Sequence, residues 1–149
     1  MRTSGEYQID PGRLDTAGAG GELEIVVPYT GPSSTAAALE RAPVLTAGLN
    51  ARVLLIAVHA LPYPLPFVCP TMVHAHLVEQ LVDLASRCPL PVNPQVVLAR
   101  DVQEGFRYAL KPGSTVLVGT SRHFWRTEEE KLARSLARDG HKVALVYIA

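Results

Sequence analysis

The chain has 149 residues, of which 48% are hydrophobic, and its formal net charge is zero. A chain of this length and composition forms one domain whose core is large enough to fold without a metal or a disulfide, and it is too apolar to be disordered throughout. The lack of net charge disfavours partners that are held by a strong positive field, namely nucleic acid and anionic membrane surfaces.

The first residues differ from the rest of the chain. Residues 1–21 lack hydrophobic periodicity and end in a Gly-rich run, so we expect a flexible arm there and an α/β domain over residues 22–149. Nothing in the arm resembles a signal peptide, and no apolar run approaches the roughly 18 residues of a membrane span. Cys69 and Cys88 flank a predicted helix that separates them by about 25 Å, too far for a disulfide. We therefore expect reduced thiols in a cytoplasmic protein without membrane insertion.

Five apolar runs alternate with segments of helical periodicity. The strands are expected at residues 22–29, 51–60, 94–100, 114–120 and 142–148. Between the first two, a helix begins at one of the N-cap candidates Ser33, Ser34 and Thr35, contains Pro43 and ends near Gly48. Four prolines at residues 61–70 predict an extended apolar connection, which precedes a helix over residues 71–87.

Two capping boxes mark the remaining helices. Asp101 and Glu104 start a short helix that should turn Val102, Phe106 and Ala109 inward. The pair Thr127 and Glu130 starts the last helix, for which Gly140 suits the C-terminal cap. Apolar strands that alternate with helices indicate a parallel sheet covered on both faces, and such sheets bind ligands beyond the carboxyl ends of the strands.

The order and lengths of these elements, the turn "VVPYTGPSSTAAALERA" and the end "STVLVGTSR…KLARSLARDGHKVALVYI" resemble the universal stress protein family over residues 22–148. The resemblance implies an open five-stranded parallel sheet in the order 3-2-1-4-5, with helices on both faces. Some members of that family bind ATP. If this chain does so, we expect the nucleotide at Pro28, Tyr29, Thr30, Val58, Gly119, Thr120, Ser121 and Arg122.

The family's ATP binders share the pattern Gly-x2-Gly-x9-Gly-[Ser/Thr] after strand four. Gly119 fits the first glycine, but Arg122 stands at the second, and Leu132 or the pair Glu129-Glu130 stands at the third. Three carboxylates, Glu128 to Glu130, also occupy the helix start where a phosphate would sit, and like charges that close cost on the order of 2–4 kcal/mol. We therefore predict no cofactor and weak or absent ATP binding.

The last strand predicts a homodimer. In the implied order it lies at an edge of the sheet, and its run "KVALVYI" has no interior charge or proline to blunt that edge. The resemblance points the same way, because many family members dimerise through this strand. The expected interface residues are Val143, Leu145, Val146, Tyr147 and Ile148.

Other side chains gave weaker signals. His74 and His76 are two apart on a helix and are expected on its surface, while His59 ends the second strand and is either a ligand contact or a hydrogen-bonded strand-end residue. The segments "SRHFWR" and "LPYPLPF" either fold back on the domain or contact another protein. With no nucleophile, base or metal set, we expect a non-enzymatic universal-stress-type domain that dimerises and contacts an unknown protein; the alternative is an ATP-binding domain with a degenerate phosphate site.

Overall fold

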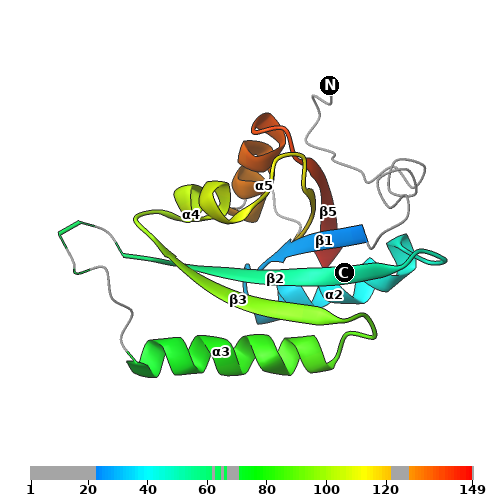
Figure 1. Cartoon of the computed structure of the whole chain (residues 1–149), viewed down its shortest axis with the longest axis horizontal. Coiled ribbons are helices and arrows are strands. Elements are labelled where there is room, and N and C mark those ends of the chain that lie inside the picture. Colours follow the sequence, from blue (N-terminus) through cyan, green and yellow to red (C-terminus); the bar gives the residue numbers. More distant parts are fainter. Residues whose placement is uncertain (1–22, 62, 65, 67–70, 122–127, 149) are drawn as a thin grey trace.

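The computed structural model describes residues 23–61, 63–64, 66, 71–121 and 128–148, so the predicted arm lies outside the described residues. The described residues form a five-stranded sheet in the order β3-β2-β1-β4-β5, with every neighbouring pair parallel (Figure 1). The strands are β1 (Leu23–Pro28), β2 (Ala51–Ala60), β3 (Val92–Ala99), β4 (Thr115–Ser121) and β5 (Lys142–Ile148). The predicted fold class and strand order are confirmed.

Helices cover both faces of the sheet. Helices α2 (Pro32–Leu45) and α3 (Thr71–Ser86) pack on one face, α2 over β1, β4 and β5 and α3 over β2 and β3 (Figure 1). Helices α4 (Val102–Ala109) and α5 (Glu128–Arg138) pack on the other, α4 over β2 and β3 and α5 over β4 and β5. This arrangement explains the apolar runs of the central strands, residues 25–28 in β1, 53–58 in β2 and 116–118 in β4, because both faces of these strands are covered.

Alternation along β1 divides the core into two layers. Ile25 and Val27 point into the layer beneath α2 and α3, and both are 0% exposed. Val26 points into the layer beneath α4 and α5, together with Phe106 and Leu136. Successive side chains of a strand point to opposite faces, so one strand supplies both layers.

The start of α2 differs from the sequence prediction. The helix begins at Pro32, and its N-cap residue is Gly31, which makes no side-chain capping bond; residues 33–35 are therefore not N-caps. Gly31 has a φ of +130°, which other residues rarely adopt, and a proline in the first turn sacrifices no helical hydrogen bond. Ser34 and Thr35 lie inside the first turn and are buried.

The third strand begins at Val92, two residues earlier than predicted, although it contains Pro94. The N–H of Val53 donates to the carbonyl of Pro91 (2.8 Å), so the backbone groups of odd-numbered residues in β3 face β2 and those of even-numbered residues face outward. Pro94 is even-numbered and lies on an edge strand. Its missing N–H therefore breaks no bond of the sheet, which is the position where a strand tolerates proline.

Of the two predicted capping boxes, the structure describes only the one at the start of α4 in full. Asp101 caps α4 as predicted, since its Oδ1 accepts a hydrogen bond from the backbone N–H of Glu104 (2.7 Å). Phe106 is buried, but Val102 is 42% exposed, so the prediction that it points into the core is wrong. It lies in the first turn of α4, at the mouth of the cleft described below. The box that involves Thr127 lies outside the described residues.

Candidate functional site

A cleft opens where the strand order reverses, beside the carboxyl ends of β1 and β2. Its volume is about 350 Å³. Its walls come from the end of β1, from β2 and from the helices α4 and α5. The lining residues are Tyr29, Thr30, Val58, Val102, Gln103, Phe106, Glu128, Glu129, Lys131 and Leu132. This is the place where open α/β sheets bind ligands.

Thr30 ties the end of β1 to its neighbours. Its hydroxyl donates to the carbonyl of Gly119 (3.0 Å) and lies 2.9 Å from the hydroxyl of Ser34. Because the single proton of Thr30 is used on Gly119, Ser34 is the donor in the second bond. The N–H of Thr30 donates to the Oγ1 of Thr35 (3.0 Å). The N–H and the hydroxyl of Thr30, a residue expected to contact nucleotide, are thus both engaged within the protein.

Gly119 is required by packing. A Cβ atom on this residue would lie 1.8 Å from the carbonyl oxygen of Ser34 and 2.5 Å from its carbonyl carbon. The first turn of α2 therefore crosses β4 with no room for a side chain. This contact explains the glycine without any bound nucleotide, so the one position that fits the family's glycine pattern has a structural cause.

Carboxylates lie beside the end of β4. Thr120 is 0% exposed, and its hydroxyl donates to Oε1 of Glu129 (3.3 Å). Glu128 forms an ion pair with Lys131 (3.2 Å) at the exposed rim. Negative charge complements the positive end of the α5 dipole, so the helix start is stabilised by its own side chains. The hydroxyl of Thr120, one of the residues expected to contact nucleotide, therefore bonds to a carboxylate of the protein.

Of the residues predicted to bind nucleotide, three line the cleft: Tyr29, Thr30 and Val58. Pro28, Gly119 and Thr120 are buried next to it, in β1 and β4. Ser121 is the last residue of β4, and only its backbone is described. Arg122 lies outside the described residues.

The sequence did not predict that residues of α4 and α5 would line the cleft. Val102, Gln103 and Phe106 reach the cleft from α4, and Lys131 and Leu132 reach it from α5. The available signal was the spacing of four between Val102 and Phe106, which places both on one helical face. That spacing does not distinguish a residue in the core from one at the mouth of a cleft.

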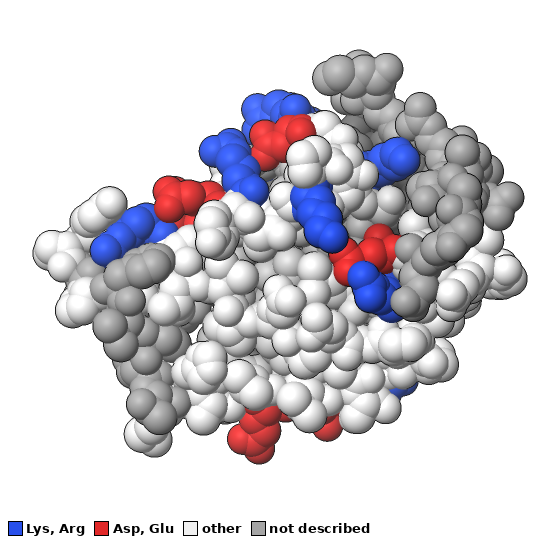
Figure 2. All heavy atoms as spheres, viewed as in Figure 1, with Lys and Arg blue, Asp and Glu red and all other residues white. Residues whose placement is uncertain are grey.

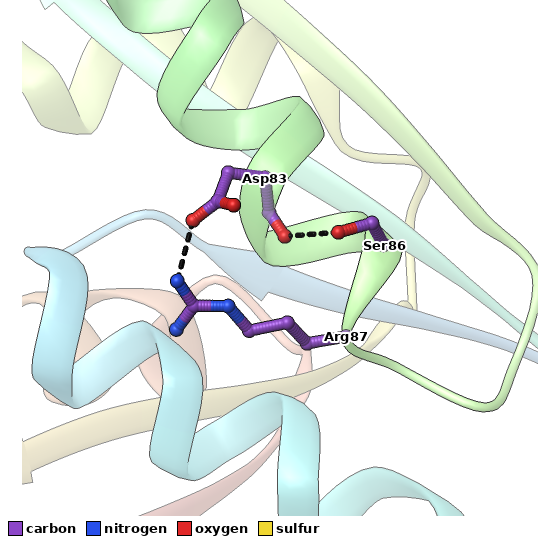
Figure 3. Close-up of polar contacts among 3 residues, drawn as sticks. All are labelled: Asp83, Ser86 and Arg87. Atoms are coloured by element: carbon purple, nitrogen blue, oxygen red, sulfur yellow. Dashed lines mark hydrogen bonds and ion pairs between the residues drawn. The ribbon is translucent and has the colours of Figure 1, made fainter.

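A second cleft of about 290 Å³ lies on the opposite face, between α2 and α3. The Tyr29 hydroxyl donates to Oε1 of Gln80 (3.0 Å), and burial raises the pKa of this phenol, so it stays protonated at neutral pH. Asp83 and Arg87 form an ion pair (2.6 Å) one turn apart, and the Ser86 hydroxyl donates to the Asp83 carbonyl (2.7 Å; Figure 3). Both charged side chains are more than 60% exposed, so this pair contributes little stability.

The histidines lie apart from one another. His74 and His76 are exposed on α3, as predicted, and His59 is partly exposed near the end of β2. His59 is absent from the described lining of the cleft. Across the described residues, no three side chains of the His, Cys, Asp or Glu type lie together as ligands for a metal ion.

Arg100 holds the described part of the proline-rich connection. Its guanidinium lies 4.2 Å above the centre of the Tyr63 ring and donates to the carbonyl of Leu61 (2.9 Å). Tyr63 nevertheless stays 79% exposed. The tyrosine therefore packs on the domain through one face of its ring and presents the other to solvent.

Comparison with known proteins identifies the architecture. No protein-family model and no curated protein sequence matches the chain. A solved structure of a universal stress protein in complex with cAMP superposes with a TM-score of 0.50 at 15% identity, over 85% of this chain and 95% of that one. A universal stress family protein from Burkholderia pseudomallei gives a TM-score of 0.52 at 22% identity, over 84% and 94%. The chain therefore has the fold of the universal stress proteins.

Proposed function

We propose that the chain is a non-catalytic universal-stress-type domain, which acts in stress response or regulation by forming a homodimer and contacting another protein. The observation that carries this proposal is that described residues expected to contact a nucleotide are engaged within the protein instead. Thr30 and Thr120 are hydrogen bonded within the protein, and the carbonyl of Ser34 fills the space above Gly119. In the described part of the cleft, these groups are therefore not available as donors to a triphosphate.

The hydroxyl groups at the cleft do not resemble activated nucleophiles. The proton of Thr30 is donated to a backbone carbonyl, which is not a base that could remove it. The proton of Thr120 is donated to Glu129, but Thr120 is fully buried and cannot reach a substrate. This arrangement supports a role in binding, without catalysis.

The edge of β5 supports the dimer. The N–H of Lys142 donates to the carbonyl of Ser114 (2.9 Å), so even-numbered residues of β5 face β4 and odd-numbered ones face away. The backbone groups of Val143, Leu145 and Tyr147 thus point outward along an edge without proline. A two-fold partner would pair with these groups in antiparallel fashion.

Light scattering after size exclusion tests the dimer. We expect about twice the chain mass of 16.1 kDa at tens of micromolar protein. Leu145→Pro removes one outward N–H and no bond to β4, so it should yield a monomer that still unfolds cooperatively. A wild-type mass of 16.1 kDa would refute the dimer. A dimer unchanged by the proline would place its interface elsewhere.

Exposed apolar side chains support contact with another protein. Helix α3 carries more apolar residues than one buried face can hold, so Met72, Val73, Val78 and Val82 are 37–86% exposed.

On the face shown in Figure 2, the part over β3 carries no charged side chain, while Lys, Arg, Asp and Glu are interspersed above it over α4 and α5. Such mixed charge gives no basic stripe for nucleic acid on this face.

The cysteine chemistry supports a cytoplasmic location. Cys88 is a free, partly buried thiol whose Sγ lies 3.7 Å from the carbonyl oxygen of Leu39. Free buried thiols are typical of reducing compartments.

None of the helices in the described part of the chain is both long enough and apolar enough to cross a membrane.

A second candidate function is binding of ATP or a related nucleotide. The position of the cleft at the strand reversal favours it, as does the neighbour that was solved with cAMP. Calorimetric titration with magnesium ATP and with cAMP separates the two candidates. We expect dissociation constants above about 10 μM, which is about −7 kcal/mol. A tighter constant would show that the phosphate site is functional.

A further inference from the structure

The cleft has an apolar interior beside the hydrogen-bonded hydroxyls of Thr30 and Thr120. Val58 from β2, Val102 and Phe106 from α4 and Leu132 from α5 supply its apolar wall. Phe106 and Leu132 are 1% and 7% exposed, so they form the floor, whereas Val102 is 42% exposed and forms the rim. A space of about 350 Å³ with such walls suits a flat organic ring.

Among the described residues, the charge of the cleft lining is negative and unevenly distributed. The charged residues in the described lining are Glu128, Glu129 and Lys131. Lys131 is paired with Glu128, and in that pair the side chains are 56% and 85% exposed. Within the described residues, the interaction shown for Glu129 is the hydrogen bond from the buried Thr120. Glu128 is thus paired with Lys131 at the rim, and Glu129 is held by Thr120 at the end of β4.

The anchoring of Glu129 makes it suitable for recognising a cation. A carboxylate on a helix start usually extends into water, where an ion pair contributes little. Glu129 is partly buried and is oriented by a side chain that is 0% exposed, so less rotational freedom is lost when a ligand binds. Its hydrogen bond to Thr120 uses Oε1, so Oε2 can accept from an ammonium group.

We propose that this cleft binds a small organic cation that combines a flat apolar ring with a protonated amine. The amine donates to Glu129, and the ring lies against Val58, Val102 and Phe106. Within the described lining, an anion of the same shape meets two carboxylates and an ammonium that is already paired. This inference goes beyond the proposed function, because it does not depend on whether the chain dimerises.

Three indole compounds of similar shape test the charge preference: tryptamine, which is cationic, tryptophol, which is neutral, and indole-3-acetate, which is anionic. Each is titrated into the full chain and followed by amide chemical shifts in NMR spectra. We expect tryptamine to bind about tenfold more tightly than tryptophol, because a hydrogen bond to a charged group is worth about 1.5 kcal/mol or more. Indole-3-acetate should be weakest. Equal affinities, or tighter binding of the anion, would overturn the proposal.

Two substitutions with the same change of charge locate the carboxylate. Glu129→Gln keeps an acceptor for Thr120 and should reduce tryptamine affinity to that of tryptophol, a loss of about tenfold. Glu79→Gln, on the exposed side of α3 and outside the cleft lining, should change it by less than about twofold, as expected for a distant screened charge. Unchanged binding in Glu129→Gln, or equal losses in both variants, would overturn the assignment. The ATP titration with the wild type reports separately on the phosphate site.

Discussion

Replacing Gly119 with alanine should destabilise the protein strongly, although a glycine in a strand normally costs stability. Gly119 has no positive φ, so alanine is acceptable to its backbone, and the loss of a flexible glycine would by itself stabilise by about 0.5–1 kcal/mol. The new Cβ, however, would lie 1.8 Å from the Ser34 carbonyl oxygen, where contacts below 3.0 Å are essentially never found. Helix α2 and strand β4 must separate by about 1.2 Å, the difference between these distances.

That separation has a calculable cost. Overpacking of a closely packed core costs about 1–3 kcal/mol. The same movement stretches the bonds from Thr30 to Gly119 and Ser34, now 3.0 and 2.9 Å long, each worth about 1 kcal/mol. We expect Gly119→Ala to lose about 3–5 kcal/mol. In urea denaturation with a slope near 2 kcal/mol per M, its midpoint should fall by about 1.5–2.5 M.

Gly113→Ala is the matched control. Its φ of +70° strains an alanine, yet a Cβ there meets nothing within 4 Å. It should lose about 1–2 kcal/mol from conformation alone. A loss below about 1 kcal/mol in Gly119→Ala, or equal losses in the two variants, would refute the conclusion that backbone contact excludes a side chain at this position.

The remaining predictions concern a helix cap and a histidine. Asp101→Ala should lower the free energy of unfolding by about 1 kcal/mol, because its bond to the Glu104 N–H is lost, whereas Asp101→Asn should lower it by much less; equal denaturation midpoints for all three proteins would contradict the cap. His141 should make stability depend on pH. Its neutral ring accepts the Ser114 N–H through Nδ1 (3.1 Å), and burial lowers its pKa from 6.5, which Asp139 partly opposes. A lowered folded-state pKa means that this contribution is complete above pH 6.5 and declines as the pH falls below it. His141→Asn, which keeps an acceptor but cannot titrate, should flatten the dependence of urea-monitored stability on pH below pH 6.5, and an unchanged slope would contradict the assignment.

Much of the fold was predictable because its determinants are local. Strands buried on both faces must be apolar, and residues 53–58 in the middle of β2 show this as an uninterrupted apolar run. Asp101 was recognised as a cap because a capping box involves residues three apart. Pro94 misled the prediction for β3, since whether a proline is tolerated depends on which side of the strand lacks a neighbour, and strand order is a non-local property.

The cleft was less predictable, for the same reason. Helical spacing places Val102 and Phe106 on one face of α4, but only the position of α4 over the sheet decides that Phe106 is 1% exposed and Val102 42%. The first helix begins at Pro32, after Gly31 with its positive φ. The sequence also offers Ser33, Ser34 and Thr35 as N-cap residues, and these led to a predicted helix start that was too late. Local patterns identify the face of a helix, and the tertiary packing decides what that face meets.

The two ends of the cleft have different chemistry, and this difference bears on how the fold is used. At the β4 end, Gly119 is explained by its contact with Ser34, and the hydroxyls of Thr30 and Thr120 serve the protein itself. At the α4 end, an apolar wall remains open beside Glu129. A phosphate group needs several free donors at once, so its site is lost when a few are engaged, whereas an apolar wall needs only shape. The proposed absence of a triphosphate site is therefore compatible with the proposed binding of an organic cation in the same cleft.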